Sequence, residues 1–183
     1  MKTTPYTSTE YQQLGRDMTE FAEILYRLRS LVSRSYGPNS KLTRAVATAH
    51  EVFPALKWSL QELATAQLPI KDIIDAFSAG LPADYWPPQE LPGCTKQETA
   101  IITKALEQRL LADKRTPLSV IELKAVAQVL YHIDAALFQI IEKTDALDPK
   151  GHTAAKALPI PWLTIGDAFI AVSKELLRVR DGQ

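Results

Sequence analysis

The chain is poor in the residues from which most active sites and covalent cross-links are built. Its 183 residues include one cysteine, three histidines and seven glycines, and 21 lysines and arginines balance 21 aspartates and glutamates. The single cysteine, Cys94, excludes an internal disulfide and a cysteine-rich zinc site, which fits a reducing cytoplasm. Because the formal charge is zero, any affinity for nucleic acid or an anionic membrane must come from a local patch.

Long apolar runs are missing as well. The first fifteen residues lack the apolar core of a signal peptide, and no window approaches 18 uninterrupted apolar residues. We therefore expect a cytoplasmic protein without a membrane partner. With 46% apolar residues, the chain is long enough for one hydrophobic core and short for two. We expect a single domain over residues 1–183, with a flexible N-terminus at 1–7.

Catalytic and metal-binding motifs are equally scarce. His50, His132 and His152 fall in none of the patterns HExxH, HxxxH and ExxH, and no Walker loop, GxGxxG or GxSxG is present. We expect no metal and no cofactor, and we favour a protein that is not an enzyme. Cys94 precedes an expected helix, a position that can lower the pKa of a thiol, but we favour a plain structural or surface thiol over a catalytic one.

What the chain does contain is apolar residues at helical spacing. From Ser8 to about Tyr36 they recur at alternating steps of three and four, which is typical of a helix that buries one seam. The residues of this seam are Tyr11, Leu14, Met18, Phe21, Leu25, Leu28 and Val32. Gly37-Pro38-Asn39 ends the helix, and Ser40 is a suitable N-cap for a second helix that runs back beside the first.

The second helix carries a proline in its interior. Pro54 removes one backbone donor and clashes with the carbonyl of His50, so we expect a kink or break at 50–54. A short third helix is expected at 70–79, ended by Gly80.

Three further helices complete the predicted architecture. Thr95 and Glu98 form a capping box that predicts a fourth helix to about residue 112. Thr116-Pro117 predicts the start of a fifth helix, whose apolar stripe is wide enough to contact more than one neighbour, and Thr164 opens the last. We predict an all-α, single-domain, antiparallel bundle of about six helices.

Two long connections, 81–94 and 148–162, join these helices, and each contains tryptophan beside proline. Loops of this length are uncommon in compact domains and need an explanation. We favour the interpretation that the tryptophans anchor the connections onto the bundle. The alternative is a pocket or partner surface made of aromatic residues: Trp58, Tyr85, Trp86 and Trp162.

Positive charge concentrates around the turn between the first two helices. No acidic residue occurs between Glu23 and Glu51. The candidate anion-binding residues in this hairpin tip are Arg27, Arg34, Lys41 and Arg44. Arginines late in the first helix complement the helix dipole. Lys41 and Arg44, near the start of the second helix, do not fit that account and leave binding of phosphate groups or an acidic partner open.

The segment RAVATAH, from Arg44 to His50, resembles in its spacing the arginine-and-histidine motif of the HEPN superfamily. Members of that superfamily are small helical bundles that often cleave RNA as dimers. The resemblance implies that Arg44 steadies the phosphate charge and that His50 moves protons at the ribose 2′-hydroxyl.

Three functions therefore stand as hypotheses. The first is a helical binding or scaffolding protein without catalytic activity, acting through protein–protein contacts or self-association as a homo-oligomer. The second is a nucleic-acid-binding accessory protein that uses the hairpin tip at 27–44. The third is a HEPN-like ribonuclease that uses Arg44 and His50.

The ribonuclease hypothesis makes a direct prediction. His50→Ala abolishes cleavage of a fluorogenic RNA because the proton-transfer group is lost, whereas the control His132→Ala retains it. An RNA that the wild-type protein leaves intact contradicts the hypothesis.

Overall fold

The computed structural model describes residues 6–65, 68–77, 91–147 and 159–182. Within these ranges the chain forms helices and no strand, which confirms the predicted all-α bundle. The helices are α1 (Ser8–Tyr36), α2 (Lys41–Thr65), α3 (Ile70–Phe77), α4 (Lys96–Leu110), α5 (Val120–Leu147) and α7 (Pro159–Arg180). Of these helices, none is both long enough and apolar enough to cross a membrane.

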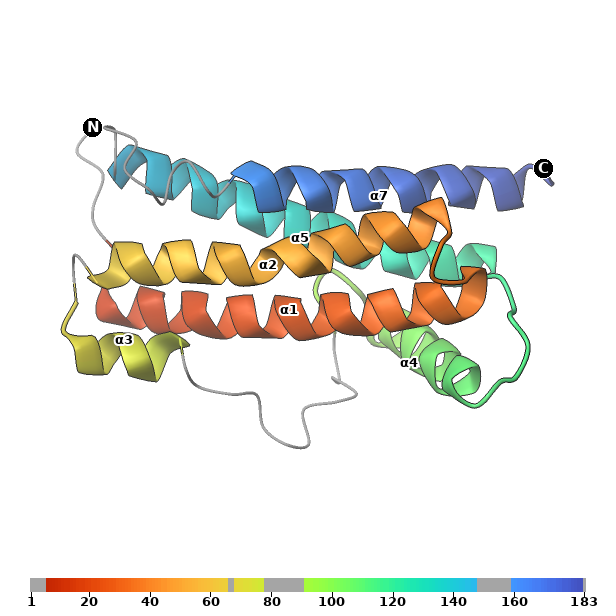
Figure 1. The fold of residues 1–183 in the computed structure, drawn as a ribbon, viewed down its shortest axis with the longest axis horizontal. Coiled ribbons are helices and arrows are strands. Elements are labelled where there is room, and N and C mark those ends of the chain that lie inside the picture. Colours follow the sequence, from red (N-terminus) through yellow and green to blue (C-terminus); the bar gives the residue numbers. More distant parts are fainter. Residues whose placement is uncertain (1–5, 66–67, 78–90, 148–158, 183) are drawn as a thin grey trace.

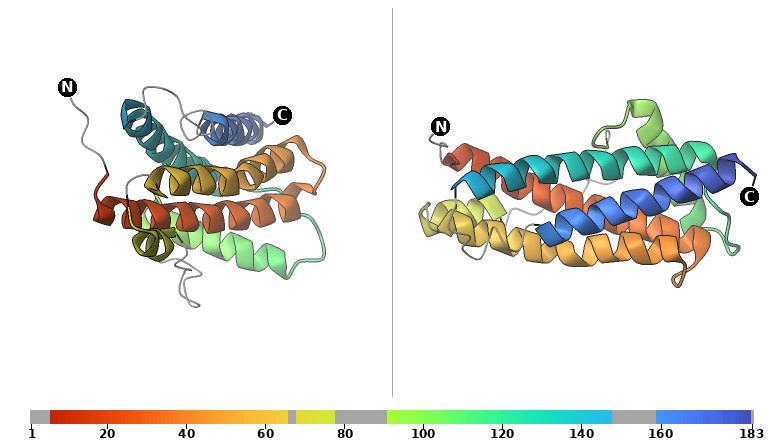
Figure 2. Two further views of the ribbon diagram at one scale, coloured as in Figure 1. Left: turned by 60° about the vertical axis from the view of Figure 1, so that its left-hand side comes forward. Right: turned by 90° about the horizontal axis from the view of Figure 1, so that it is seen from above.

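Four long helices make the body of the bundle. α1 and α2 lie side by side, α2 packs on α7, and α7 packs on α5 (Figures 1 and 2). The shorter helices α3 and α4 lie against α1 on the side away from α7, and α4 also contacts α5. α1 and α5 are not among the helix pairs whose backbones pack closely.

The predicted α1 seam lies at the centre of the hydrophobic core, because each of its apolar residues is buried. Ile24 and Leu31 are buried as well, so α1 covers its apolar surface against three neighbours, α2, α3 and α4. On α5 the predicted stripe is buried from Leu123 to Leu137, and Ile140 is partly buried at its end. Full burial of one such aliphatic side chain contributes about 1.5–3 kcal/mol.

The turn between α1 and α2 has the predicted capping residue. The Ser40 hydroxyl accepts a hydrogen bond from the backbone N–H of Thr43 at 3.0 Å, as an N-cap does. Gly37 has a φ of 86°, and a Cβ at this position would lie 2.6 Å from Nη1 of Arg115. Glycine therefore permits both the positive φ and the close approach of the arginine.

Of the two outcomes predicted at 50–54, a kink or a break, the break is excluded, because α2 continues from Lys41 to Thr65 with Pro54 inside it. Figure 1 shows that α2 bends along its length. Pro54 is exposed, while the neighbouring Phe53 and Leu56 are buried. An interior proline costs about 3 kcal/mol, and the packing of α2 between α1 and α7 offsets that cost.

The predicted start of α5 at Thr116-Pro117 is also wrong. The helix begins at Val120, and the hydroxyl of Ser119 accepts from the N–H of Glu122 at 3.3 Å. The Glu122 carboxylate in turn accepts from the Ser119 N–H at 2.7 Å, which completes a capping box.

The last helix begins earlier than predicted, at Pro159 rather than near Thr164. Proline is tolerated in the first turn of a helix, where backbone N–H groups have no intrahelical partner. Trp162 therefore belongs to α7 and not to a connection. The predicted stop at Gly80 lies outside the described residues, as do residues 81–90 and 148–158 of the predicted connections.

A buried arginine joins the end of α4 to the start of α5. Arg109 is 7% exposed, and its guanidinium donates to both carboxylate oxygens of Glu122 at 3.0 Å. It also donates to the carbonyls of Thr116 and Pro117, each at 3.2 Å. These bonds explain why the Thr116-Pro117 pair does not start the helix: its carbonyls bind the arginine. The connection is thereby fixed at both ends.

We expect Arg109→Met to lower the free energy of unfolding by about 3–5 kcal/mol, because it leaves the Glu122 charge buried without its partner. Adding Glu122→Gln removes that charge, retains a capping side chain and recovers part of the loss. Urea unfolding followed by circular dichroism measures both effects. Arg178→Met, which breaks an exposed ion pair with Glu175, is the control and costs at most about 1 kcal/mol. Equal losses for Arg109→Met and Arg178→Met contradict this interpretation.

Candidate binding groove between α1 and α5

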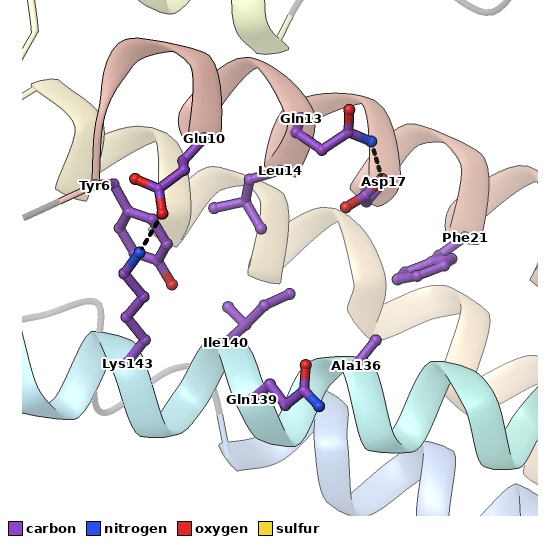
Figure 3. A pocket seen from close by; sticks show the side chains of 10 residues that line it. All are labelled: Tyr6, Glu10, Gln13, Leu14, Asp17, Phe21, Ala136, Gln139, Ile140 and Lys143. Carbon is purple, nitrogen blue, oxygen red and sulfur yellow. Dashed lines mark hydrogen bonds and ion pairs between the residues drawn. The ribbon is translucent and has the colours of Figure 1, made fainter.

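An open groove of about 280 Å³ runs between the first half of α1 and the second half of α5 (Figure 3). Its floor is apolar: Leu14 and Phe21 come from α1, and Ala136 and Ile140 from α5. The other lining residues are polar or amphipathic and form its rim: Tyr6, Glu10, Gln13, Asp17, Gln139 and Lys143. Figure 3 shows Leu14 and Ile140 facing each other across the groove.

The residue spacing explains the two-sided lining. Leu14 and Phe21 are seven residues apart on α1, and Ala136 and Ile140 are four apart on α5, so each pair projects from one face of its helix. Because the backbones of α1 and α5 do not pack closely, these faces do not fill the space between them. The small side chain of Ala136 leaves part of that space open.

One end of the groove is closed by an ion pair. Nζ of Lys143 lies 2.6 Å from Oε1 of Glu10 and 4.0 Å from the centroid of the Tyr6 ring. The other carboxylate oxygen of Glu10 accepts from the N–H of Thr7, which is the N-cap of α1. The hydrogen bond from Lys143, together with those from Thr7, lowers the pKa of Glu10 to about 2.

The rest of the rim carries hydrogen-bonding groups. Nε2 of Gln13 donates to Oδ1 of Asp17 at 2.7 Å on the α1 side. The amide of Gln139 lies on the α5 side and is exposed. The groove thus combines an apolar floor with amide and carboxylate groups along its edges.

A second pocket, of about 260 Å³, lies where α1 ends. Three cations line it, of which one was predicted to bind anions and two were not. Arg34 lines it together with Lys114 and Arg115 from the connection between α4 and α5. Of the other predicted anion-binding residues, Arg27 is paired with Glu23 at 2.7 Å, whereas Lys41 and Arg44 are exposed on α2.

The arginine that the structure places at His50 is Arg29 and not the predicted Arg44. Nδ1 of His50 lies 3.5 Å from Nη1 of Arg29, and the imidazole packs against the Tyr26 ring at a centroid distance of 5.7 Å, with the two ring planes tilted by 50°. Burial, followed by the charge of Arg29, lowers the pKa of His50. Six helical residues also separate Arg44 and His50 by about 120° around α2. The ribonuclease hypothesis stays a prediction that these contacts do not support.

The predicted aromatic pocket is described only in part. Trp58 is 67% exposed on α2, and Trp162 packs on Phe138 of α5 with ring centroids 5.6 Å apart. Tyr85 and Trp86 lie outside the described residues. A shared pocket of these side chains stays a prediction.

Cys94 does not have the lowered pKa that its place before α4 suggested. Burial, with the nearby Glu98 carboxylate, raises the pKa of the thiol to about 11. Sγ lies 3.7 Å from the carbonyl oxygen of Ala125, to which the thiol donates. The described part of the chain also holds no group of three histidine, cysteine or carboxylate side chains suited to a metal ion.

No protein family, no curated protein and no solved structure matches this chain. Its class is therefore defined by its own geometry, an all-α bundle with an apolar groove between α1 and α5. The groove was not predicted from the sequence. A local signal for it is Ala136, a small residue among the apolar residues of α5.

The Glu10–Lys143 ion pair predicts a pH dependence with a definite sign. The pKa of Glu10 is lowered from 4.5 to about 2, so the stability that this carboxylate adds is complete above pH 4.5 and is lost as the pH falls toward 2. Lys143→Met raises the pKa of Glu10 part of the way back, because the Thr7 hydrogen bonds remain. A carbon-detected NMR titration of the Glu10 carboxyl measures the shift. Lys174→Met is the control, and a Glu10 pKa that Lys143→Met leaves unchanged contradicts the assignment.

Proposed function

We propose that this protein is a non-catalytic helical adaptor that binds an amphipathic helix of a partner protein in the groove between α1 and α5. The observation that carries the proposal is an open groove over apolar side chains: Leu14 and Phe21 are buried at its base, whereas Ala136 and Ile140 are only partly buried. The carboxylates that line the groove are bonded to neighbouring side chains, Glu10 to Lys143 and Asp17 to Gln13, and no histidine or cysteine is among the described residues that line it, which favours binding over catalysis.

The dimensions of the groove suit a helix. From Glu10 to Phe21 the α1 wall rises through eleven residues, about 17 Å or three turns. Its volume of about 280 Å³ is at the low end for a pocket that encloses a whole small molecule. An open groove of this size instead accepts a few apolar side chains at i, i+3, i+4 and i+7 of a docked helix.

The rim defines the charge of the partner. The charge of Glu10 is already neutralised by Lys143. Among the described residues of the rim, Asp17 is hydrogen-bonded to the uncharged amide of Gln13 and not to a cation. We infer that the partner helix carries lysine or arginine beside its apolar stripe, near Asp17. The amides of Gln13 and Gln139 can bond polar side chains on either edge of the helix.

Site-specific photocrosslinking tests the proposal. With p-benzoylphenylalanine in place of Gln139, we expect a crosslink to a segment of a partner protein that has the apolar spacing of a helix. Ala136→Trp fills the floor and reduces the yield at least about tenfold, which corresponds to about 1.4 kcal/mol of binding free energy. The crosslinked peptide is identified by mass spectrometry.

Two controls make the outcome decisive. Ala100→Trp adds the same side chain to an exposed position on α4 and leaves the crosslink unchanged. The same crosslinker in place of Gln97, also exposed on α4, gives none. Equal yields at Gln139 and Gln97, or a yield that Ala136→Trp does not change, contradict the proposal. A crosslink between two copies of this chain would assign the groove to self-association instead.

A further inference from the structure

Exposed cations gather at the end of the bundle where α1 meets α2. Arg34, Lys114 and Arg115 surround the pocket of about 260 Å³, with the hydroxyl-bearing Ser33 beside them. Asp113 is the one carboxylate that lines this pocket among the described residues. None of the three cations has an ion-pair partner within the part of the chain that the structure describes.

The position of these cations is fixed by the fold. Arg115 packs its guanidinium on Gly37, which a side chain at that position would prevent. The hydroxyl of Tyr36 accepts from the N–H of Leu118 at 3.2 Å, and buried Arg109 binds the carbonyls that follow Arg115. The connection therefore holds Arg115 against the end of α1, so little backbone freedom is left to lose on binding.

Two more cations lie on the other side of the same turn. Lys41 and Arg44 are exposed at the start of α2, whose first turn contains no acidic residue. Positive side chains at a helix N-terminus are unfavourable, because the dipole is positive there. The chain thus carries an arrangement that weakens its own helix and that an external anion would relieve.

We propose that this basic end, defined as Arg34, Lys41, Arg44, Lys114 and Arg115, binds the phosphate backbone of a nucleic acid. One guanidinium group can donate two parallel hydrogen bonds to two oxygens of a phosphate. Three of the five cations are arginines and can bind phosphate in this way. Cations on both sides of the turn suit an anion whose charges repeat along a chain, which favours nucleic acid over a single acidic side chain. The pocket lacks aromatic and amide side chains for base contacts, so binding is independent of sequence.

This site goes beyond the proposed adaptor function, because it lies at the opposite end of α1 from the groove. Thirteen helical residues separate Phe21 from Arg34, which is about 20 Å. A helix in the groove and a nucleic acid at the basic end can therefore be bound at the same time.

Fluorescence anisotropy with a labelled 20-base-pair DNA duplex tests the inference. We expect binding at low salt, with a slope of about −4 to −5 for log K against log salt if each of the five cations meets one phosphate. Lys41→Glu with Arg44→Glu weakens binding at least about tenfold. This pair lies away from the Arg115–Gly37 contact and places carboxylates where the helix dipole favours them, so the variant remains folded.

A second pair and a matched control complete the experiment. Arg34→Glu with Lys114→Glu weakens binding by a similar factor. Arg16→Glu with Lys71→Glu changes the charge by the same amount at exposed positions outside the basic end, and it leaves the affinity within about twofold. Absence of binding at 20 mM salt, or equal losses in the control, overturns the inference. Displacement of the duplex by polyglutamate as readily as by unlabelled DNA overturns it in favour of an acidic protein partner.

Discussion

Burial of the α1 seam is the interaction on which the rest of the bundle depends. α1 is covered by α2, α3 and α4, and its buried side chains reach from Tyr11 to Val32. α2 packs on α1, α7 packs on α2, and α5 packs on α7. The positions of the other long helices therefore depend on α1. Where α1 faces the second half of α5, these contacts leave an open groove, with Leu14 and Phe21 buried at its base. The groove thus follows from how α1 is packed, not from a separate structural element.

Local patterns in the sequence predicted the elements that depend on near neighbours. The three-four spacing of the α1 seam and the Thr95–Glu98 capping box are both present as predicted. The predicted start of α5 at Thr116-Pro117 was wrong, and the helix is capped instead by Ser119 and Glu122. Thr116-Pro117 does not start the helix because its carbonyls bind buried Arg109, which lies seven and eight residues earlier in the chain.

The groove and the basic end could not be predicted in the same way, because both join segments that are distant in sequence. Glu10 and Lys143 close the groove although 133 positions separate them. Arg115 comes from the connection between α4 and α5 and packs its guanidinium on Gly37, which has no side chain in its way. A periodic pattern shows which face of a helix is apolar, but it does not show which two faces will diverge. At Pro54 the local signal holds in part, since α2 bends along its length while packing on α1 and α7 keeps it continuous.

The raised pKa of Cys94 has a practical consequence for work on this protein. With a pKa of about 11, roughly one thiol in ten thousand is ionised at pH 7, and the thiolate is the form that reacts with maleimides and oxidants. An exposed cysteine introduced elsewhere, with an ordinary pKa near 8.5, is ionised several hundred times more often. Dyes can therefore be attached at chosen surface positions while the native cysteine stays in place. Distances across the bundle then become accessible to energy-transfer measurements without disturbing its core.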